Sequence, residues 1–275
     1  MTSVSLANAR LIGAAVEQWL WLRCRLDGLA MQACLTSFLT AQACHGVAMT
    51  VELGRLFDTV WFDTHARQAC FRGTRIERQV IGGGDWIETR YLDIDGGLAT
   101  WHDVRLEALE IRAPAWGRLR WHRCGLLDTD LRHANLCEAL AVESTFRRVR
   151  FDGARLASAR LDASAFIDCD FAGAEAIGTS WRGSQLLACR LDNTRFAGSD
   201  WRFAQWKDCK ATGVDTSGVR RHGFRGEDMP TAPPLDDEDA ALAASHAWRQ
   251  RHRSEVDPKD PTPIARRQHV QPSAI

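Results

Sequence analysis

One feature constrains the fold of this chain more than any other: apolar residues recur at every fifth position. The register runs from Leu6 to Ala211 and has 42 positions, of which 39 are apolar. The exceptions are Thr36, Gly46 and Gly96. A helix would repeat at ~3.6 residues and a strand at ~2, so neither element explains the pattern. A period of five fits a chain that turns a corner every five residues and points one large side chain inward each time.

A second register lies two residues before the first and holds small side chains. In the C-terminal part of the repeats it contains only small or β-branched residues, while the other three positions of each five are mostly polar or charged. We therefore expect one large and one small residue of each five to point inward. The small positions are Cys124, Thr129, Ala134, Ala139, Ser144, Val149, Ala154, Ala159, Ser164, Cys169, Ala174, Thr179, Ser184, Cys189, Thr194, Ser199, Ala204 and Cys209.

The segments ANLCE (134–138), ARLASARLDASAFIDCDFAG (154–173) and TRFAGSDWRF (194–203) resemble the pentapeptide repeat family, whose motif places a small residue two positions before Leu or Phe. The resemblance implies an all-β fold: a right-handed quadrilateral β-helix with four pentapeptides in each coil. The 42 positions then give about ten coils, and the rod is ~50 Å long. Stability of such a solenoid comes from stacking of neighbouring coils.

If four pentapeptides make one coil, residues twenty apart stack on the same face. Six tryptophans are separated by multiples of twenty, and we expect them to fill the core rather than form an exposed stripe. Cysteines and outward charges fall in columns too, and alternating charges on adjacent strands favour this alignment. The columns are Trp21, Trp61, Trp101, Trp121, Trp181 and Trp201; Cys169, Cys189 and Cys209; Cys24, Cys44 and Cys124; Asp130, Arg150, Asp170 and Arg190; and Arg155, Glu175 and Arg195.

The cysteines do not have the pattern of a metal or redox site. Seven of the nine occupy the small inward register, with Cys70 and Cys137 as the exceptions, and no C-x-x-C pair is present. Zinc sites commonly use such closely spaced pairs. We therefore interpret the cysteines as small core residues and predict no metal ligands.

Other groups that might carry chemistry have plainer interpretations. His102 and His122 are twenty residues apart and are expected to stack on the outside of the coil as a surface pair. Asp93 and Asp95 stand between glycine clusters, which indicates a turn or irregular coil. The cluster at 82–85, GGGD, lacks the lysine and the helix of a phosphate loop. We predict no catalytic residues, no cofactor and no enzyme activity.

The five-residue phase ends near Thr216, and we predict that the β-helix ends there. Within it, residues 1–120 are the less regular part and residues 121–216 the regular part. A linker is predicted over 217–235. Seven of the eight prolines lie from Pro230 onward.

We predict a short helix over 236–253, because its acids come first, its alanines lie in the middle and its arginines come last. The helix either caps the last coil or docks on a partner, and the sequence leaves both open. Residues 254–275 are predicted to be disordered. The apolar side of the helix consists of Ala241, Ala244 and Trp248 with Leu242 at its edge, and the candidate partner-binding residues are Leu242, Trp248, Arg249 and Arg251.

Charge and hydrophobicity limit the classes of function. The chain has 35 basic and 35 acidic residues, and a net charge of zero argues against binding of nucleic acid through bulk positive charge. The start of the chain lacks the pattern of a signal peptide. Residues 28–51 carry no formal charge but are too polar for a membrane helix. We therefore expect a bacterial cytoplasmic protein without membrane insertion.

Two functions follow as expectations. The first is a non-enzymatic interaction scaffold, with the resemblance suggesting an adaptor or chaperone in type VI-like effector secretion. The second is also implied by the resemblance: some pentapeptide repeat proteins imitate DNA and protect DNA gyrase from quinolones. Such mimics rely on an acidic surface. Nine of the 35 basic and nine of the 35 acidic residues lie after residue 216, so residues 1–216 have 26 of each. The partner is a protein of unknown identity, and a homodimer is left open.

Overall fold

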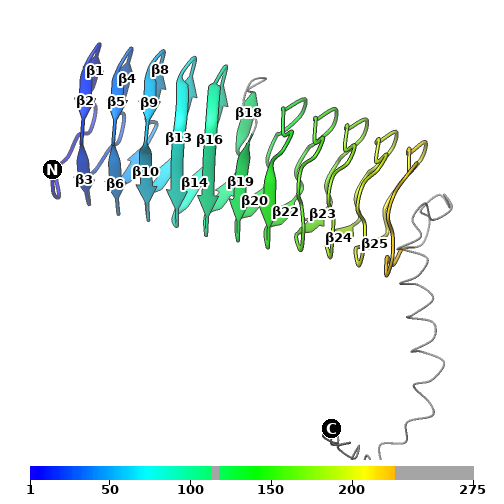
Figure 1. Cartoon of the computed structure of the whole chain (residues 1–275). Coiled ribbons are helices and arrows are strands. Elements are labelled where there is room, and N and C mark those ends of the chain that lie inside the picture. Colours follow the sequence, from blue (N-terminus) through cyan, green and yellow to red (C-terminus); the bar gives the residue numbers. More distant parts are fainter. Residues whose placement is uncertain (113–117, 227–275) are drawn as a thin grey trace, which may run out of the picture.

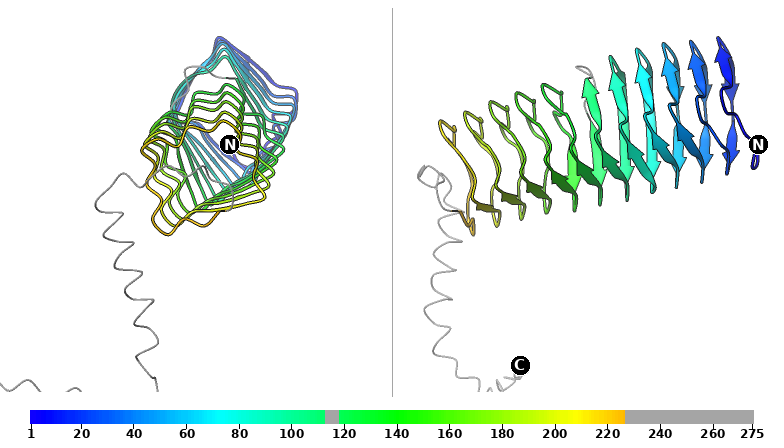
Figure 2. Two further views of the ribbon diagram at one scale, coloured as in Figure 1. Left: turned by 90° about the vertical axis from the view of Figure 1, so that its right-hand side faces the viewer. Right: turned by 180° about the vertical axis from the view of Figure 1, so that it is seen from behind.

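The five-residue period produces a chain that turns a corner once per pentapeptide. Two residues after most of the inward apolar residues, the backbone takes a left-handed φ, for example +52° at Arg23 and +51° at Ala33. The computed structural model describes residues 1–112 and 118–226, and these residues form a stack of four-sided coils (Figure 1). The view along the stack shows the coils as four-sided outlines behind one another (Figure 2, left).

Residues twenty apart lie side by side on neighbouring coils. Trp101 pairs with Trp121, and Asp130 bridges to Arg150. Every strand pair in the described chain is parallel, since the backbone returns to each face in the same direction after each coil. The predicted quadrilateral β-helix of about ten coils is confirmed. The predicted alignment of the tryptophan and charge columns on neighbouring coils is confirmed as well.

The strands are short and make three parallel sheets. The first sheet contains β1 (Arg10–Ile12), β4 (Ala30–Gln32), β8 (Thr50–Glu52), β12 (Cys70–Arg72), β15 (Arg90–Leu92) and β18 (Glu110–Arg112). The second contains β2 (Ala15–Glu17), β5 (Leu35–Ser37), β9 (Arg55–Phe57), β13 (Arg75–Gly82), β10 (Thr59–Phe62), β6 (Thr40–Gln42), β3 (Leu20–Leu22), β16 (Asp95–His102), β19 (Leu119–His122) and β21 (Leu140–Val142). The third contains β7 (His45–Val47), β11 (His65–Arg67), β14 (Asp85–Ile87), β17 (Arg105–Glu107), β20 (Gly125–Leu127), β22 (Thr145–Arg147), β23 (Ala165–Ile167), β24 (Gln185–Leu187) and β25 (Gln205–Lys207).

Two adjacent coils lack one corner. Strands β13 and β16 are eight residues long and pair over their length, so that two faces of the coil merge into one sheet. Gly96 and Gly97 both lie within β16, so this is the irregular coil that the glycine clusters indicated, and the turn lies at Asp93, whose φ is +54°. A Cβ atom on Gly97 would lie 2.4 Å from the Glu77 carbonyl oxygen, so glycine allows this close strand approach.

The core is a continuous column of large apolar side chains. All six tryptophans of the predicted column are buried, so core filling is confirmed. Several aromatic rings on successive coils stack face to face, with 4.8 Å between the ring centroids of Trp181 and Trp201 and 4.6 Å between those of Phe151 and Phe171, whereas the rings of Trp101 and Trp121 are tilted by 57°. This distance matches the spacing of adjacent strands, ~4.8 Å, so that each coil continues the stack of the one before it.

The small register is inward because its side chains sit against the backbone of the preceding coil. The Thr194 hydroxyl donates a hydrogen bond to the Phe171 carbonyl oxygen at 2.8 Å, and the Ser199 hydroxyl donates one to Ala176 at 2.7 Å. Thiols of buried cysteines point to equivalent carbonyls. Small polar residues are tolerated in this core because the backbone satisfies their hydrogen bonds.

In the C-terminal half, three of the four faces narrow to single-residue bridges joined by tight turns. In these turns the Ala154 N–H donates to the Phe151 carbonyl oxygen at 2.9 Å, and Gly153 has a φ of +65°. Glycine is favoured there because the third residue of a type II turn needs a positive φ.

The coils continue beyond Thr216, where we predicted their end. Gln205 bridges to Arg225 on the next coil. The inward apolar residues are here Val219, which is buried, and Phe224, whose ring centroid lies 5.6 Å from that of Trp206. The apolar side chain has moved to the register that is small in the preceding coils, so counting along the large register alone placed the boundary too early.

Candidate binding surface

Most charged side chains on the rod are paired with each other. Arg123 donates hydrogen bonds to both carboxylate oxygens of Asp103 on the preceding coil at 2.7 Å, and these hold the pKa of Asp103 down at about 2. Arg148 binds Asp128 in the same way at 2.6 and 2.8 Å. Such corner pairs neutralise the surface locally.

The predicted charge columns form, but only part of their charges pair between coils. Arg190 lies 3.5 Å from Asp170, and Glu175 lies within 3.9 Å of both Arg155 and Arg195. The remaining members pair within their own coil: Asp130 with Arg132 at 2.7 Å and Arg150 with Asp152 at 3.7 Å. In either arrangement no continuous acidic stripe results along these columns.

The histidines and the acidic pair do not build a site. His102 and His122 lie side by side on the outside of the coil, as predicted. Asp93 occupies a corner with φ +54°, and Asp95 points outward toward Arg75 at 3.8 Å. Within residues 1–112 and 118–226, no group of His, Cys, Asp and Glu side chains has the arrangement of a metal site.

Most of the cysteines are core residues, and we therefore expect their thiols to react slowly. All nine are free thiols and seven are buried, while Cys137 and Cys209 are half-buried. Burial raises the pKa of Cys124 to about 11, from a usual 9.0. In the native protein at neutral pH we expect iodoacetamide to modify Cys124 at least ~100-fold more slowly than Cys137, because only the thiolate reacts.

Timed alkylation followed by mass spectrometry of the peptides measures these rates. The same experiment in guanidinium chloride is the control, and there the two thiols should react alike. Equal rates in the native protein would contradict the burial of Cys124 and reopen a redox role.

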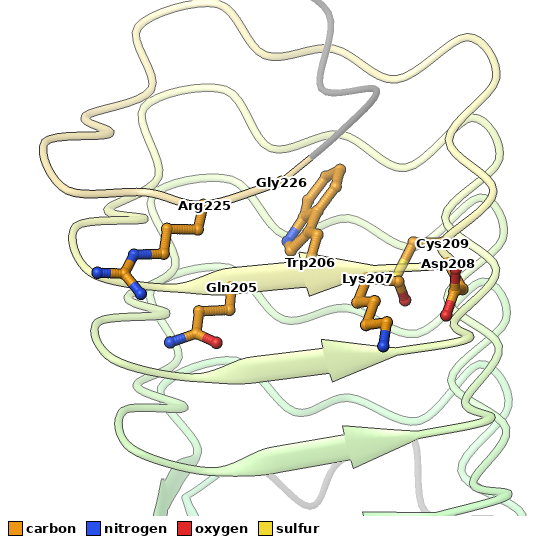
Figure 3. Close-up of a pocket in the computed structure, with 7 residues that line it drawn as sticks. All are labelled: Gln205, Trp206, Lys207, Asp208, Cys209, Arg225 and Gly226. Carbon is orange, nitrogen blue, oxygen red and sulfur yellow. The ribbon is translucent and has the colours of Figure 1, made fainter.

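One pocket lies at the last described coil, next to Trp206 (Figure 3). Its polar side chains do not converge: Gln205 and Arg225 point to one side of the indole, whereas Asp208 and Cys209 lie at the opposite corner. The described chain stops beside it at Gly226.

The outward side chains of one face in the N-terminal half carry no Asp, Glu, Lys or Arg. This face is made by β3, β6, β10 and the C-terminal parts of β13 and β16. The other three faces of the same coils all carry charges, for example Asp27, Arg72 and Arg55. We call it the uncharged face, and it comprises Leu20, Leu22, Thr40, Gln42, Val60, Phe62, Val80, Gly82, Thr100 and His102.

The uncharged face contains a shallow apolar groove of about 550 Å³ along the edge where the corner is missing. Val60 and Val80 line it, together with Phe38 and Leu98 from the adjoining edge. Phe38 is 59% exposed, and Phe62 on the same face is 41% exposed. At the edge of the groove, an Arg78 amino group donates a hydrogen bond to Asp58 at 2.6 Å, and this pair raises the pKa of Arg78. The groove thus offers apolar contacts beside an ion pair that is already satisfied.

The predicted partner-binding residues lie outside the described residues. These are Leu242, Trp248, Arg249 and Arg251. The uncharged face, in contrast, was not predicted from the sequence. Spacing by twenty could have identified it, because Leu20, Thr40, Val60, Val80 and Thr100 form one outward column.

In the described part of the chain, no helix combines the length and the apolar character needed to cross a membrane. The architecture is that of a parallel β-solenoid with a five-residue repeat, a class in which neighbouring coils supply nearly all contacts.

Comparison with known proteins agrees with this class. Residues 129–166 match the family of pentapeptide repeats in eight copies. The same five-residue turns, with the same inward registers, continue through the coils on both sides of this segment. Residues 129–166 thus carry the repeats of this family. No curated protein matches it at a significant level.

Solved structures of several β-solenoids are similar over most of the chain. HetL, a pentapeptide repeat protein involved in heterocyst differentiation regulation from the cyanobacterium Nostoc, is 14% identical; the match covers 82% of this chain and 90% of that chain, with a TM-score of 0.34. Full-length QnrB1, a plasmid-mediated fluoroquinolone resistance protein, is 11% identical, with coverages of 87% and 99% and a TM-score of 0.23. The A-module of the Azotobacter vinelandii mannuronan C-5 epimerase AlgE4 is 8% identical, with coverages of 82% and 91% and a TM-score of 0.38.

Proposed function

We propose that this chain is a non-enzymatic protein-interaction scaffold that binds a protein partner through the uncharged face. The supporting observation is an outward face without Asp, Glu, Lys or Arg that carries an apolar groove at Phe38, Val60, Val80 and Leu98, on a surface whose charges are otherwise largely paired. Contiguous apolar surface of this kind is typical of interaction sites. Parallel sheets are also normally covered on both sides. Here the core of the coil covers the inner side of the sheet, and the outer side is left open.

The setting that we propose is bacterial effector secretion of the type VI kind, with the protein acting as an adaptor or chaperone in the cytoplasm. This part of the proposal comes from the family resemblance. An adaptor must hold its partner without altering it, and a rigid rod with one uncharged face is suited to that task.

Imitation of DNA at DNA gyrase is the alternative. It needs a continuous acidic surface that presents charges as a DNA backbone does. The corner pairs Arg123–Asp103 and Arg148–Asp128 place a guanidinium directly on the carboxylates that would supply it. This pairing favours the scaffold over the mimic.

Substitution of Val80 by aspartate tests the scaffold function. A charge in the middle of the uncharged face should reduce capture of a bound protein from native lysate at least tenfold, because an unpaired carboxylate would have to be desolvated. Leu187→Asp is the matched control, since Leu187 is 39% exposed on β24 of a different face. Bound proteins are identified by mass spectrometry.

Thermal unfolding of both variants checks that the rod remains folded. The scaffold proposal predicts that bound proteins are retained by Leu187→Asp and lost with Val80→Asp. Retention of the same proteins by both variants would contradict it, and gyrase subunits among the retained proteins would favour the alternative.

A further inference from the structure

The uncharged face ends at a basic group toward the C-terminal end of the rod. The outward column that contains Val60 and Val80 continues through Thr100 to Arg120. Thr100 pairs with Arg120 on the next coil. Arg120 is exposed and has no ion-pair partner among the described residues. Exposed Arg118 lies close by in sequence, 3.6 Å from Glu138. An occupant of the face therefore meets positive charge at this end.

The length of the face limits what can cover it. From Leu20 to Arg120 the column crosses five coil spacings, which is ~24 Å. Its strands are mostly three residues wide, or ~10 Å, so that the area is on the order of 300 Å². A stable interface between two copies of the chain needs ~800 Å² on each partner. The face is too small for a second rod but has the length of a single helix, since a helix over 236–253 would be ~27 Å long.

The acidic start of that segment complements Arg120, and its apolar residues match the middle of the face. Acidic residues occupy 236–239, apolar residues follow at Ala241, Leu242 and Trp248, and arginines end the segment at 249–253. With the acids at Arg120, the apolar side chains would lie over Val80 and Val60.

The chain is long enough to place the segment there. Arg120 and Arg220 belong to one column, linked by successive bridges over five coils, ~24 Å. The described chain ends at Gly226, after one more corner. Residues 227–235 can span ~30 Å when extended, enough to bring Asp236 back to Arg120.

We propose that residues 236–253 dock along the uncharged face of their own chain, with their acidic end at Arg120. The inference rests on the proposed function of this face as a binding surface. The segment occupies the site while no partner is bound, and a partner must displace it. The apolar column is then covered in the free protein.

Hydrogen exchange of the full chain tests the docking. In the wild-type protein, amides of 236–253 should exchange at least tenfold more slowly than the intrinsic rate of an unstructured peptide. Val80→Asp should remove this protection, and Arg120→Glu should reduce it without disturbing the core, because Arg120 is exposed. Asp237→Arg combined with Arg120→Glu should restore part of it. Leu187→Asp, the control on another face, should leave it unchanged.

Two results would overturn the proposal. One is a segment 236–253 without protection in the wild-type protein. The other is protection that persists in both Val80→Asp and Arg120→Glu, which would place the segment elsewhere, for instance on the last coil. Protection that disappears on dilution would assign the segment to a second copy and would equally overturn docking within one chain.

The outcome is separable from the test of partner binding. Exchange reports only on 236–253, whereas capture reports only on bound proteins. Suppose that the wild-type protein captures no partner, while Val80→Asp removes the protection of 236–253. The docking proposal would then stand, and only the scaffold function would be contradicted.

Discussion

Replacement of Trp181 by alanine is expected to lower the free energy of unfolding by about 3–5 kcal/mol. The indole is fully buried, and its ring centroid lies 4.8 Å from that of Trp201 and 5.3 Å from that of Phe166. Because each coil contacts only its neighbours, the cavity breaks the aromatic column and weakens the interface between two halves of the rod. Guanidinium chloride unfolding, monitored by far-UV circular dichroism, measures the loss.

Trp181→Phe is the matched control for this prediction. The indole N–H of Trp181 has no acceptor in the core, so phenylalanine removes an unsatisfied donor while it keeps an aromatic ring in the stack. Its cost should stay below about 1.5 kcal/mol. If alanine and phenylalanine destabilised the protein equally, stacking would not be the source of the stability.

Replacement of Gly84 by alanine is the second substitution with a large expected effect. A Cβ atom on Gly84 would lie 2.2 Å from the Thr64 carbonyl oxygen, and the backbone φ is +82°. The backbone of the neighbouring coil would have to move, and the left-handed conformation adds its own cost. Together these should lower the free energy of unfolding by about 3–5 kcal/mol, measured by the same chemical denaturation.

Gly173→Ala separates the two contributions. Gly173 has a similar φ of +66°, but nothing lies within 4 Å of the Cβ position. Its substitution should cost about 1–2 kcal/mol, from the backbone conformation alone. A cost at Gly173 as large as that at Gly84 would show that the contact with Thr64 is unimportant.

The repeat allowed most of the fold to be predicted from the sequence. A period of five cannot be met by a helix or a long strand, and spacing by twenty then fixes which side chains stack, as Trp101 and Trp121 do. The inward assignment of the small register also holds, because residues such as Thr194 hydrogen-bond to the preceding coil. These features depend on local spacing alone, which a single sequence contains.

The missing corner could not be predicted in this way. Arg78 and Leu98 occupy corner positions and are no less suited to a turn than Leu53 or Phe38, which do adopt a left-handed φ. The corner is lost because β13 and β16 support each other as neighbours. Buried Gln79 lies beside it, in the register that is small in the C-terminal coils, and accepts a hydrogen bond from the Tyr91 hydroxyl at 3.2 Å.

The uncharged face was missed for another reason. A column such as Val60 and Val80 is apolar yet points outward, and in sequence it resembles further core. The inward positions of these strands are already filled by residues such as Trp61 and Ile81, so spacing by twenty would have placed Val60 and Val80 on the outside. The tail residues that the sequence singled out for partner binding, Leu242 and Trp248 among them, remain a prediction.

The link between residues twenty apart has a kinetic consequence. Pairs such as Asp200 and Arg220 set the typical separation of contacts along the described chain, so the relative contact order is ~0.1, a value usual for fast-folding helical bundles rather than β-sandwiches. Each new coil needs only the coil before it as a template. The rod can therefore grow from its N-terminal end while the chain is being synthesised, and additional repeats lengthen it without slowing the search for native contacts.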